Sequence, residues 1–346
     1  MTTRVAFLFP GQGSQAVGMG ADIFASSPAA RRVFETVDEA LGFPLSELCF
    51  HGPEETLRET INTQPAIVTV SLALLAALQE ALSPHAPSSW PSWTQPLAPS
   101  FTAGHSVGEY AALVASGALS LKDAAVLVRE RGRRMHHEGT VCPGGMAAVI
   151  GMEEEPLQAI CREVTEQRTA NLPADAHPGM GRVIVANFNA PGQIVISGEQ
   201  GALEAAMEQA KARGAKRVIP LVVSGAFHSP VMQPAALGLS RTLATTEVQD
   251  AAIPVIGNIQ AAPLTEAAAL REELAGQVAA SVQWTRTIEY MASQGVTVFL
   301  EIGPGQALTG MVKRIAKGVT TLNVSTEADL AKSIDALRAM QLTHGV

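Results

Sequence analysis

The stretch SFTAGHSVGEYAALVASG (Ser100–Gly117) places a serine between two glycines at the end of a short apolar run. It contains the pattern G-x-S-x-G, and an alanine-rich segment follows. In a strand–turn–helix unit this pattern exposes the serine hydroxyl above the sheet, and the helix N-terminus offers backbone N–H groups to an oxyanion. A turn serine that caps a helix starting at Val107 explains the pattern as well. The motif alone leaves Ser106 open between a nucleophile and a helix cap.

Two other apolar runs end in glycine-rich turns of the same kind. Val5–Phe9 runs into GQGSQ, and Thr297–Ile302 runs into GPGQALTGM. Short apolar runs and glycine turns that alternate with longer helix-period segments predict an α/β fold with a mostly parallel sheet. Reactive groups gather at the carboxyl ends of the strands in such sheets, so we expect the three turns to lie together there.

The middle of the chain has a different order of elements. They are an apolar run from Met146, a helix-like stretch at Glu153–Gln167, two runs joined by a turn at Asn189–Gly192, a helix-like stretch at Glu199–Arg213, and the run AKRVIPLVVSG. This order of strand, helix, two strands, helix and strand is that of a ferredoxin-like unit. We therefore predict a large domain of residues 1–142 and 222–346, with a small domain of residues 143–221 inserted into it. Stretches 85–99 and 171–181 have the composition of loop insertions.

Composition excludes several classes of protein. With 346 residues, 47% of them hydrophobic and 16% charged, the chain is globular. A net charge of −8 argues against nucleic acid as the main partner. Three cysteines without C-x-x-C spacing fit a reducing cytoplasm. The apolar stretch Ala66–Leu78 is shorter than the ~20 residues of a membrane span, and the N-terminus lacks a signal peptide pattern, so we expect a soluble, cytoplasmic protein.

A nucleophilic serine needs a general base within hydrogen-bond reach. His228, in VVSGAFHSP, follows a strand-like run and is the best candidate, although a lone histidine there is more often structural. His105 is a weaker candidate, because a sequence neighbour on a turn usually points elsewhere. His136 and His137 suit a solvated helix end, and no second cluster of ligands supports zinc, so we expect neither metal nor cofactor.

Arg131 lies on an apolar helix face. It follows Leu127 by four residues and Val128 by three, on the same face of a helix at Leu121–Glu138. A buried arginine needs an anionic partner, unless its stem is buried and its head reaches water. The planar guanidinium fork matches a carboxylate, so Arg131 is a candidate clamp for a carboxylate-bearing ligand.

The loop GQGSQA (Gly11–Ala16) formally matches the dinucleotide fingerprint G-x-G-x-x-G/A. Pro10 intervenes, however, and the acidic residues at the right distance lie in a helix-like stretch instead of ending a second strand. Nucleotide binding is therefore not expected, and the loop is better suited to supply a backbone N–H beside Ser106.

Taken together, the motifs resemble one family, the malonyl-CoA:acyl carrier protein transacylases, which include the acyltransferase domains of polyketide synthases. The matching segments, spaced in the family's order over nearly the whole chain, are FPGQGSQ (Phe9–Gln15), TQPAI (Thr63–Ile67), GHSVGEYAALVASGALS (Gly104–Ser120), RG-x-x-M (Arg131–Met135), PGGMAAVIG (Pro143–Gly151), NAPGQIVISG (Asn189–Gly198), FHSP-x-M (Phe227–Met232) and QW-x-x-TIEYM…FLEIGPG-x-x-LTG.

The resemblance assigns roles to these positions. It implies that Ser106 is the nucleophile, His228 its base and Arg131 the clamp on the malonyl carboxylate. The amides of Gln12 and Val107 are implied as the oxyanion hole, and a main-chain carbonyl, at Gln277, as the group that orients the histidine. The family fold is a large α/β-hydrolase-like domain with a ferredoxin-like insert.

The resemblance also implies malonyl-CoA as the substrate, acyl carrier protein as the acceptor, and a monomer. Phe227, where bacterial stand-alone enzymes commonly carry serine, and Val107 both favour malonyl over methylmalonyl, and Phe227 and His105 are expected beside the substrate. A carrier that is acidic, as in the family, would need a basic patch on this acidic chain. The available clusters are Lys211–Arg217 and Lys313–Lys317, each of which is more simply a solvated helix face.

Three alternatives remain open. Besides fatty-acid synthesis, the product could feed a polyketide assembly line in trans. A serine esterase would want an acidic residue for the histidine and an HGGG-like motif, and the latter is absent. A non-catalytic docking protein would have no reason to keep Ser106, His228, Arg131 and Gln12 together.

Overall fold

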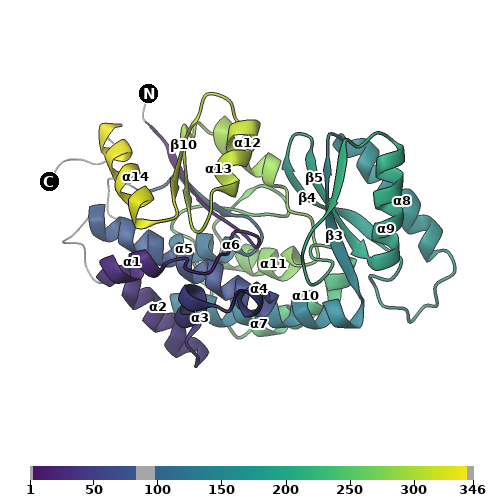
Figure 1. The fold of residues 1–346 in the computed structure, drawn as a ribbon, viewed down its shortest axis with the longest axis horizontal. Coiled ribbons are helices and arrows are strands. Elements are labelled where there is room, and N and C mark those ends of the chain that lie inside the picture. The colour runs from purple at the N-terminus through teal and green to yellow at the C-terminus, as the bar shows by residue number, and fades with distance from the viewer. Residues whose placement is uncertain (1–2, 83–97, 341–346) are drawn as a thin grey trace.

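A computed structural model describes residues 3–82 and 98–340 of the chain (Figure 1). In this part, one mostly parallel sheet and one separate antiparallel sheet are each covered by helices (Figure 1). The predicted α/β class with a parallel sheet is confirmed. The expected loop insertion at 85–99 lies almost wholly outside the described residues, whereas 171–181 forms a series of turns.

The large sheet has the strand order β10–β9–β1–β2–β7–β8. The strands are β1 (Val5–Phe9), β2 (Phe101–Gly104), β7 (Val255–Ile256), β8 (Pro263–Leu264), β9 (Val298–Ile302) and β10 (Thr320–Val324). The neighbouring strands from β10 across to β7 pair in parallel, whereas β8 runs antiparallel to β7 at the edge of the sheet. Since β9, β1 and β2 are neighbours, the three glycine-rich turns meet at one edge of the sheet, as predicted.

Helices cover both faces of this sheet, because successive side chains of a strand point to opposite faces. Phe7 and Phe9 of β1 pack with α5 and α6, while Ala6 and Leu8 pack with α12 and α13. The helices of this unit are α1 (Ala21–Ser26), α2 (Pro28–Leu41), α3 (Leu45–His51), α4 (Glu54–Arg58), α5 (Thr60–Leu82), α6 (Gly108–Ala115), α7 (Leu121–Val141), α10 (Gln233–Leu243), α11 (Ala267–Gln277), α12 (Trp284–Ser293), α13 (Ala307–Ile315), α14 (Glu327–Ala339) and the short 3-10 helix η1 (Pro230–Met232).

The antiparallel sheet has the strand order β4–β5–β3–β6. Its elements follow one another as β3 (Gly144–Ile150), α8 (Glu154–Thr169), β4 (Val183–Ala190), β5 (Gln193–Glu199), α9 (Gln200–Ala212) and β6 (Arg217–Pro220). The helices α8 and α9 lie on the same side of this sheet, at the right of Figure 1, and share its core. The strand-like run before His228 is shorter than expected, because β6 ends at Pro220 and the chain then crosses to the large unit, leaving Val222 95% exposed.

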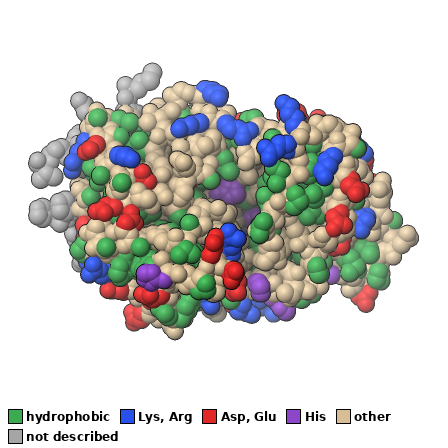
Figure 2. All heavy atoms as spheres, viewed as in Figure 1, with side chains coloured by type: hydrophobic (Ala, Val, Ile, Leu, Met, Phe, Trp, Pro, Cys, Tyr) green, Lys and Arg blue, Asp and Glu red, His purple; other side chains and the backbone are tan. Residues whose placement is uncertain are grey.

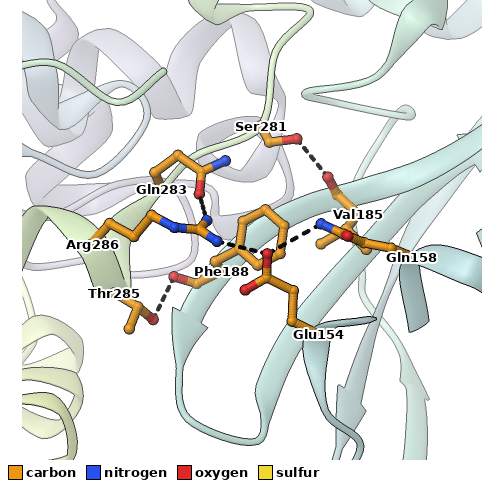
Figure 3. Close-up of polar contacts among 8 residues, drawn as sticks. All are labelled: Glu154, Gln158, Val185, Phe188, Ser281, Gln283, Thr285 and Arg286. Carbon is orange, nitrogen blue, oxygen red and sulfur yellow. Dashed lines mark hydrogen bonds and ion pairs between the residues drawn. The ribbon is translucent and has the colours of Figure 1, made fainter. Parts of the chain in front are cut away.

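The segment between α11 and α12 joins the two sheets. Val282 forms an isolated parallel bridge with Asn187 of β4. Figure 3 shows Ser281 and Thr285 donating hydrogen bonds to backbone carbonyls of β4, at 2.6 and 3.0 Å. In the same view, Arg286 pairs with Glu154 of α8 at 2.7 Å. The small sheet is therefore anchored on the same segment that leads back to α11 and the candidate site.

Helix α5 corrects the expected length of the apolar stretch. Thr60–Leu82 is a continuous helix of 23 residues, with Pro65 inside its first turns. By length and composition it could cross a membrane, but 78% of its most apolar window is buried inside the fold. It packs against α2, α6 and α7, so it is explained as the central helix of the core.

Candidate active site

Ser106 lies on a strained turn between β2 and α6. Its φ is 52°, in the left-handed region that residues with a side chain rarely adopt. The amide N–H donates to Asn258 Oδ1 at 2.8 Å and the carbonyl accepts from Gln277 Nε2 at 2.8 Å, so both backbone groups are held. Helix α6 begins at Gly108, its N-cap is Val107, and no side chain caps it. The helix-cap alternative for Ser106 is therefore wrong.

The two glycines of G-x-S-x-G are required by close packing. A Cβ on Gly104 would lie 1.9 Å from the carbonyl carbon of Gly108. A Cβ on Gly108 would lie 2.2 Å from the carbonyl oxygen of Phe9 on β1. These approaches press the turn against the neighbouring strand, which brings Ser106 beside the loop that follows β1.

His228 faces Ser106 across the turn. Its Nε2 lies 2.6 Å from Ser106 Oγ, and its Nδ1 lies 2.9 Å from the carbonyl oxygen of Gln277 and 3.1 Å from that of Ala280. Because a carbonyl only accepts, Nδ1 carries the proton, and the lone pair of Nε2 points at the hydroxyl. Two main-chain carbonyls thus orient the ring where a carboxylate does so in a Ser-His-Asp triad.

Burial and the positive charge of Arg131 lower the pKa of His228 to about 3, against the raising effect of its backbone hydrogen bonds. The imidazole is only 3% exposed. It is therefore neutral over the whole neutral range and can accept the serine proton at any physiological pH.

This pKa predicts how the reactivity of Ser106 depends on pH. We expect the rate of Ser106 sulfonylation by phenylmethylsulfonyl fluoride to hold from neutral pH down to about pH 5 without a histidine-like fall. Replacing Arg131→Met removes a charge that opposes the imidazolium, so the pKa of His228 should rise towards its ordinary value of 6.5 and the acid limb should move to higher pH. If the sulfonylation rate falls over the same acidic pH range in the wild type and in Arg131→Met, the charge of Arg131 does not lower the pKa of His228.

Arg131 is buried beside the pair, on the face of α7 that the sequence predicted, with 1% of its surface exposed. Its NH1 donates to Gln64 Oε1 at 2.7 Å, and its NH2 donates to Gln277 Oε1 at 2.7 Å and to Ser106 Oγ at 3.2 Å. Its buried Nε has no hydrogen-bond partner among the described residues. The charge is thus held by neutral amides beside the serine, and no carboxylate in the described part of the chain forms an ion pair with it.

Two backbone amides near Ser106 remain free. Among the residues that the structure describes, neither the N–H of Gln12 nor that of Val107 has a hydrogen-bond acceptor. The amide of Ser106 is already taken by Asn258. The loop after β1 reaches the turn because Gly11 leaves room: a Cβ there would lie 2.5 Å from the carbonyl oxygen of His105. The free pair is suited to an oxyanion.

A cavity of about 770 Å³ opens at this point of the molecule. Its lining includes Gln12, Gln64, Ser106, Phe227 and His228 from the large unit, together with residues of β3, β4 and β5. Figure 2 shows a hollow near the centre of the face, with histidine side chains inside it. The reactive pair therefore lines a cleft between the loops that follow β1 and β2 and the strands of the small sheet.

His105 and Phe227 both line this cavity. The Nε2 of His105 lies 2.8 Å from Asn189 Oδ1 of β4, and its ring packs edge-on against Trp284 at 5.4 Å between centroids. Burial lowers the pKa of His105. Its ring faces the small sheet, and none of its described hydrogen bonds goes to Ser106, which fits its place as a weaker candidate for the base than His228.

Several polar residues around Ser106 were missed by sequence reasoning. They are Gln64, Glu109, Asn189 and Asn258, all buried. Glu109 had a signal, because it is the one charged residue of the otherwise apolar helix GEYAALVA. The other three lie 42 to 152 positions from Ser106 in a chain whose local spacing gives no indication of contact. Within the described ranges, no group of three metal-ligating side chains occurs.

Comparison with known proteins gives this site a family. The model of the acyl transferase domain matches residues 6–335. The chain belongs to the acyl transferase family. This acyl transferase is 44% identical over 336 residues to the malonyl CoA-acyl carrier protein transacylase of Bacillus subtilis (strain 168), covering 97% of this chain and 98% of the relative. It is 39% identical over 334 residues to the protein of the same name from Escherichia coli (strain K12), covering 96% and 99%.

Solved structures agree with the sequence relatives. The acyl transferase is similar to an acyl-carrier-protein S-malonyltransferase from Bartonella henselae, with a TM-score of 0.87 and 39% identity over 98% of this chain and 100% of the other. It is also similar to a malonyl-transacylase in complex with its type II PKS acyl-carrier protein, with a TM-score of 0.85 and 37% identity over 96% and 100%. The resemblance noted from the motifs is thereby confirmed.

Proposed function

We propose that the protein transfers the malonyl group from malonyl-CoA to the phosphopantetheine thiol of acyl carrier protein, through a malonyl ester on Ser106. The proposal rests on the surroundings of Arg131. This side chain is a buried guanidinium 3.2 Å from Ser106 Oγ, and it lacks a carboxylate partner in the described chain. A substrate that brings its own carboxylate completes such a site, whereas a neutral ester leaves the buried charge unpaired.

In the first half-reaction, His228 Nε2 takes the proton of Ser106 as Oγ attacks the thioester carbonyl. The tetrahedral oxyanion accepts hydrogen bonds from the amides of Gln12 and Val107, a type of contact worth on the order of 10²–10³ in rate for each donor. The C–S bond then breaks, the sulfur of CoA takes the proton from His228, and malonyl remains on Ser106. Arg131 holds its carboxylate throughout.

In the second half-reaction, the phosphopantetheine thiol of the carrier gives its proton to His228 and attacks the malonyl ester. The intermediate collapses as the ester C–O bond breaks and Ser106 regains the proton. The acyl group thus moves between two sulfurs by way of one oxygen, which requires ping-pong kinetics. Gln277 and Ala280 hold the His228 ring through both halves, since their carbonyls fix its tautomer.

The decisive experiment offers malonyl-CoA to the purified protein, with and without holo acyl carrier protein. We expect a malonyl adduct by intact mass without the carrier, its transfer to the carrier thiol when the carrier is added, and parallel lines in double-reciprocal plots. Release of free malonate without a carrier thioester would instead identify an esterase. Absence of any adduct would refute the proposal.

We further propose that the product supplies fatty-acid synthesis. A polyketide assembly line served in trans is the second candidate, and the similarity to a transacylase solved with a type II PKS carrier favours it. Rates with one carrier of each kind decide between them. For malonyl selectivity over methylmalonyl we propose Phe227 and Val107, of which Phe227 lines the cavity and is 5% exposed.

For the carrier we propose a positively charged docking surface beside the cleft. Lys and Arg side chains gather along the upper part of the face in Figure 2, around α13 and the adjoining small sheet. Lys313 and Arg314 of α13, and Lys317 just after it, are exposed and form no ion pair within the described chain. Arg213 of the other cluster is paired with Glu163, so that cluster has less charge to offer. An acidic carrier fits the α13 cluster by charge.

The domain boundaries and setting are also proposals. We infer an α/β-hydrolase-like domain of residues 1–142 and 222–346 and a ferredoxin-like domain of residues 143–221. The strand order β4–β5–β3–β6 with α8 and α9 supports the latter. We propose a cytoplasmic monomer that works without nucleic acid or membrane. Three buried free cysteines and a net charge of −8 support that setting.

A further inference from the structure

Glu109 is a buried carboxylate directly behind Ser106 that the proposed chemistry does not use. It lies in the first turn of α6 and none of its surface is exposed. The N-terminus of a helix favours a negative charge, but a buried charge also needs hydrogen-bond donors. The partners of Glu109 therefore indicate what it does.

Both carboxylate oxygens of Glu109 accept hydrogen bonds from neighbours of Ser106. Oε1 accepts from the backbone N–H of Asn258 at 3.1 Å, and Oε2 accepts from the side-chain amide of Gln277. Both contacts use the carboxyl oxygens as acceptors, and the carboxylate form has only acceptors to offer. Burial and nearby Glu273 raise the pKa of Glu109 well above its ordinary value, and these two donors and the charge of Arg131 oppose that rise.

Gln277 has its amide orientation set by this contact. Its Nε2 donates to Glu109 and, at 2.8 Å, to the carbonyl of Ser106, so its Oε1 must face Arg131, which donates at 2.7 Å. A flipped amide would place N–H groups against the guanidinium. The backbone carbonyl of the same residue accepts from His228 at 2.9 Å. One glutamine thus contacts the base, the clamp and the nucleophile.

Asn258 is the second residue that Glu109 holds. Its backbone is fixed by the carboxylate, and its side chain accepts from the N–H of Ser106 at 2.8 Å while donating to the carbonyl of Gly104 at 2.7 Å. Asn258 and Gln277 therefore hold the two backbone groups of Ser106 at its positive φ. Glu109 is the only described side chain that bonds to both.

We infer that Glu109 is a positioning residue of the transfer site, which aligns Ser106, His228 and Arg131 through Gln277 and Asn258 without touching the substrate. This inference rests on the proposed malonyl transfer. The inference extends that function, because it makes Glu109 a determinant of both the transfer rate and the preference for a carboxylate-bearing acyl group.

The test is Glu109→Gln, which keeps the shape but turns one accepting oxygen into a donor. One of the two contacts must then break, and the buried donor left without a partner should cost about 10- to 100-fold in kcat/KM for malonyl transfer. Because Arg131 is anchored through Gln277, the malonyl-to-acetyl rate ratio should fall as well. A purely structural role would change the melting temperature and leave that ratio intact.

The matched control is Glu301→Gln, another buried carboxylate that is fully used as an acceptor. Its Oε1 accepts from the backbone N–H of Leu308 at 3.0 Å and its Oε2 from that of Thr309 at 2.7 Å, and neither contact involves Asn258 or Gln277. The substitution breaks one of two contacts in the same way, so it should lower the melting temperature and leave the malonyl-to-acetyl ratio at the wild-type value. A double-mutant cycle with Gln277→Met gives the second readout. If Glu109 acts through Gln277, the loss of rate in the double variant should be clearly smaller than the sum of the two single losses.

Failures of the two proposals are distinguishable. If the wild type does not transfer malonyl, the proposed function is wrong. If the wild type transfers and Glu109→Gln keeps the wild-type rate and ratio, or its loss simply adds to that of Gln277→Met, the positioning role is wrong and the function stands. Should Glu109→Gln not fold, Glu109→Asp keeps two accepting oxygens on a shorter stem. Its malonyl-to-acetyl ratio should fall, and an unchanged ratio would overturn the inference.

Discussion

Ser106→Ala should abolish the malonyl adduct and lower the turnover number on the order of 10⁶-fold, the loss seen when the serine of a catalytic triad is removed. The reason is that Oγ lies 2.6 Å from His228 Nε2, which can take its proton, and 3.2 Å from Arg131 NH2, which can hold the malonyl carboxylate. Without it, a water molecule would have to attack the thioester directly. Intact mass after incubation with malonyl-CoA measures the adduct, and a carrier transfer assay measures the rate.

Binding of malonyl-CoA should survive this substitution. Arg131 keeps its bonds to Gln64 and Gln277, and the backbone of the turn is held by Asn258 and Gln277 and not by the hydroxyl. The dissociation constant, measured by calorimetry, should therefore change little. A variant that neither binds nor folds would show a structural role for Ser106.

Ser116→Ala is the matched control, because Ser116 ends the same helix that Ser106 precedes. It is buried, and its hydroxyl donates only to the carbonyl of Leu113, at 2.9 Å. We expect a full adduct and a near-normal rate. An adduct that persists in Ser106→Ala would contradict the assignment of the nucleophile, whatever the control shows.

The parts of the site that sequence could predict are those with a local pattern. Arg131 was found because helical spacing places it on an apolar face, and Ser106 because glycines mark its turn. The meeting of the turns after β1, β2 and β9 follows from a general rule for parallel sheets, and the structure agrees. Each of these predictions needed only residues close together in the chain.

The rest of the site depends on contacts between distant segments. Asn258 follows β7, a strand of two residues that is too short to have a period, and reaches Ser106 across 152 positions. The side chain of Gln277 lies on α11, whose polar and apolar residues are not separated into faces, and yet it bonds to Arg131 across 146 positions. Short strands and mixed helices carry little pattern, so the frame behind the serine becomes visible only when the chain is folded.

Arg131→Ala should convert a malonyl-selective enzyme into an unselective and slow one. Two charge-assisted hydrogen bonds to the malonyl carboxylate, each worth roughly 1.5–3 kcal/mol, would be lost. This corresponds to a fall of roughly 10²–10⁴-fold in kcat/KM for malonyl-CoA. Acetyl-CoA makes no such bonds, and its binding no longer has to leave a buried charge unpaired, so its rate should hold or rise. Competition between malonyl-, methylmalonyl- and acetyl-CoA, read as acyl-enzyme mass, measures the change.

Two further variants test this clamp, one by separating its charge from its geometry and the other as a control on the same helix. Arg131→Lys keeps the charge but loses the planar fork, so it should recover only part of the malonyl rate, since a single ammonium group cannot bind both carboxylate oxygens in the plane of the fork. Arg129→Ala, two residues earlier on α7, removes an arginine that packs on Phe43 and donates to Asn62 at 2.7 Å. Its malonyl selectivity should remain that of the wild type. Unchanged selectivity in Arg131→Ala would refute the clamp, and with it the main reason to prefer a dicarboxylic acyl group.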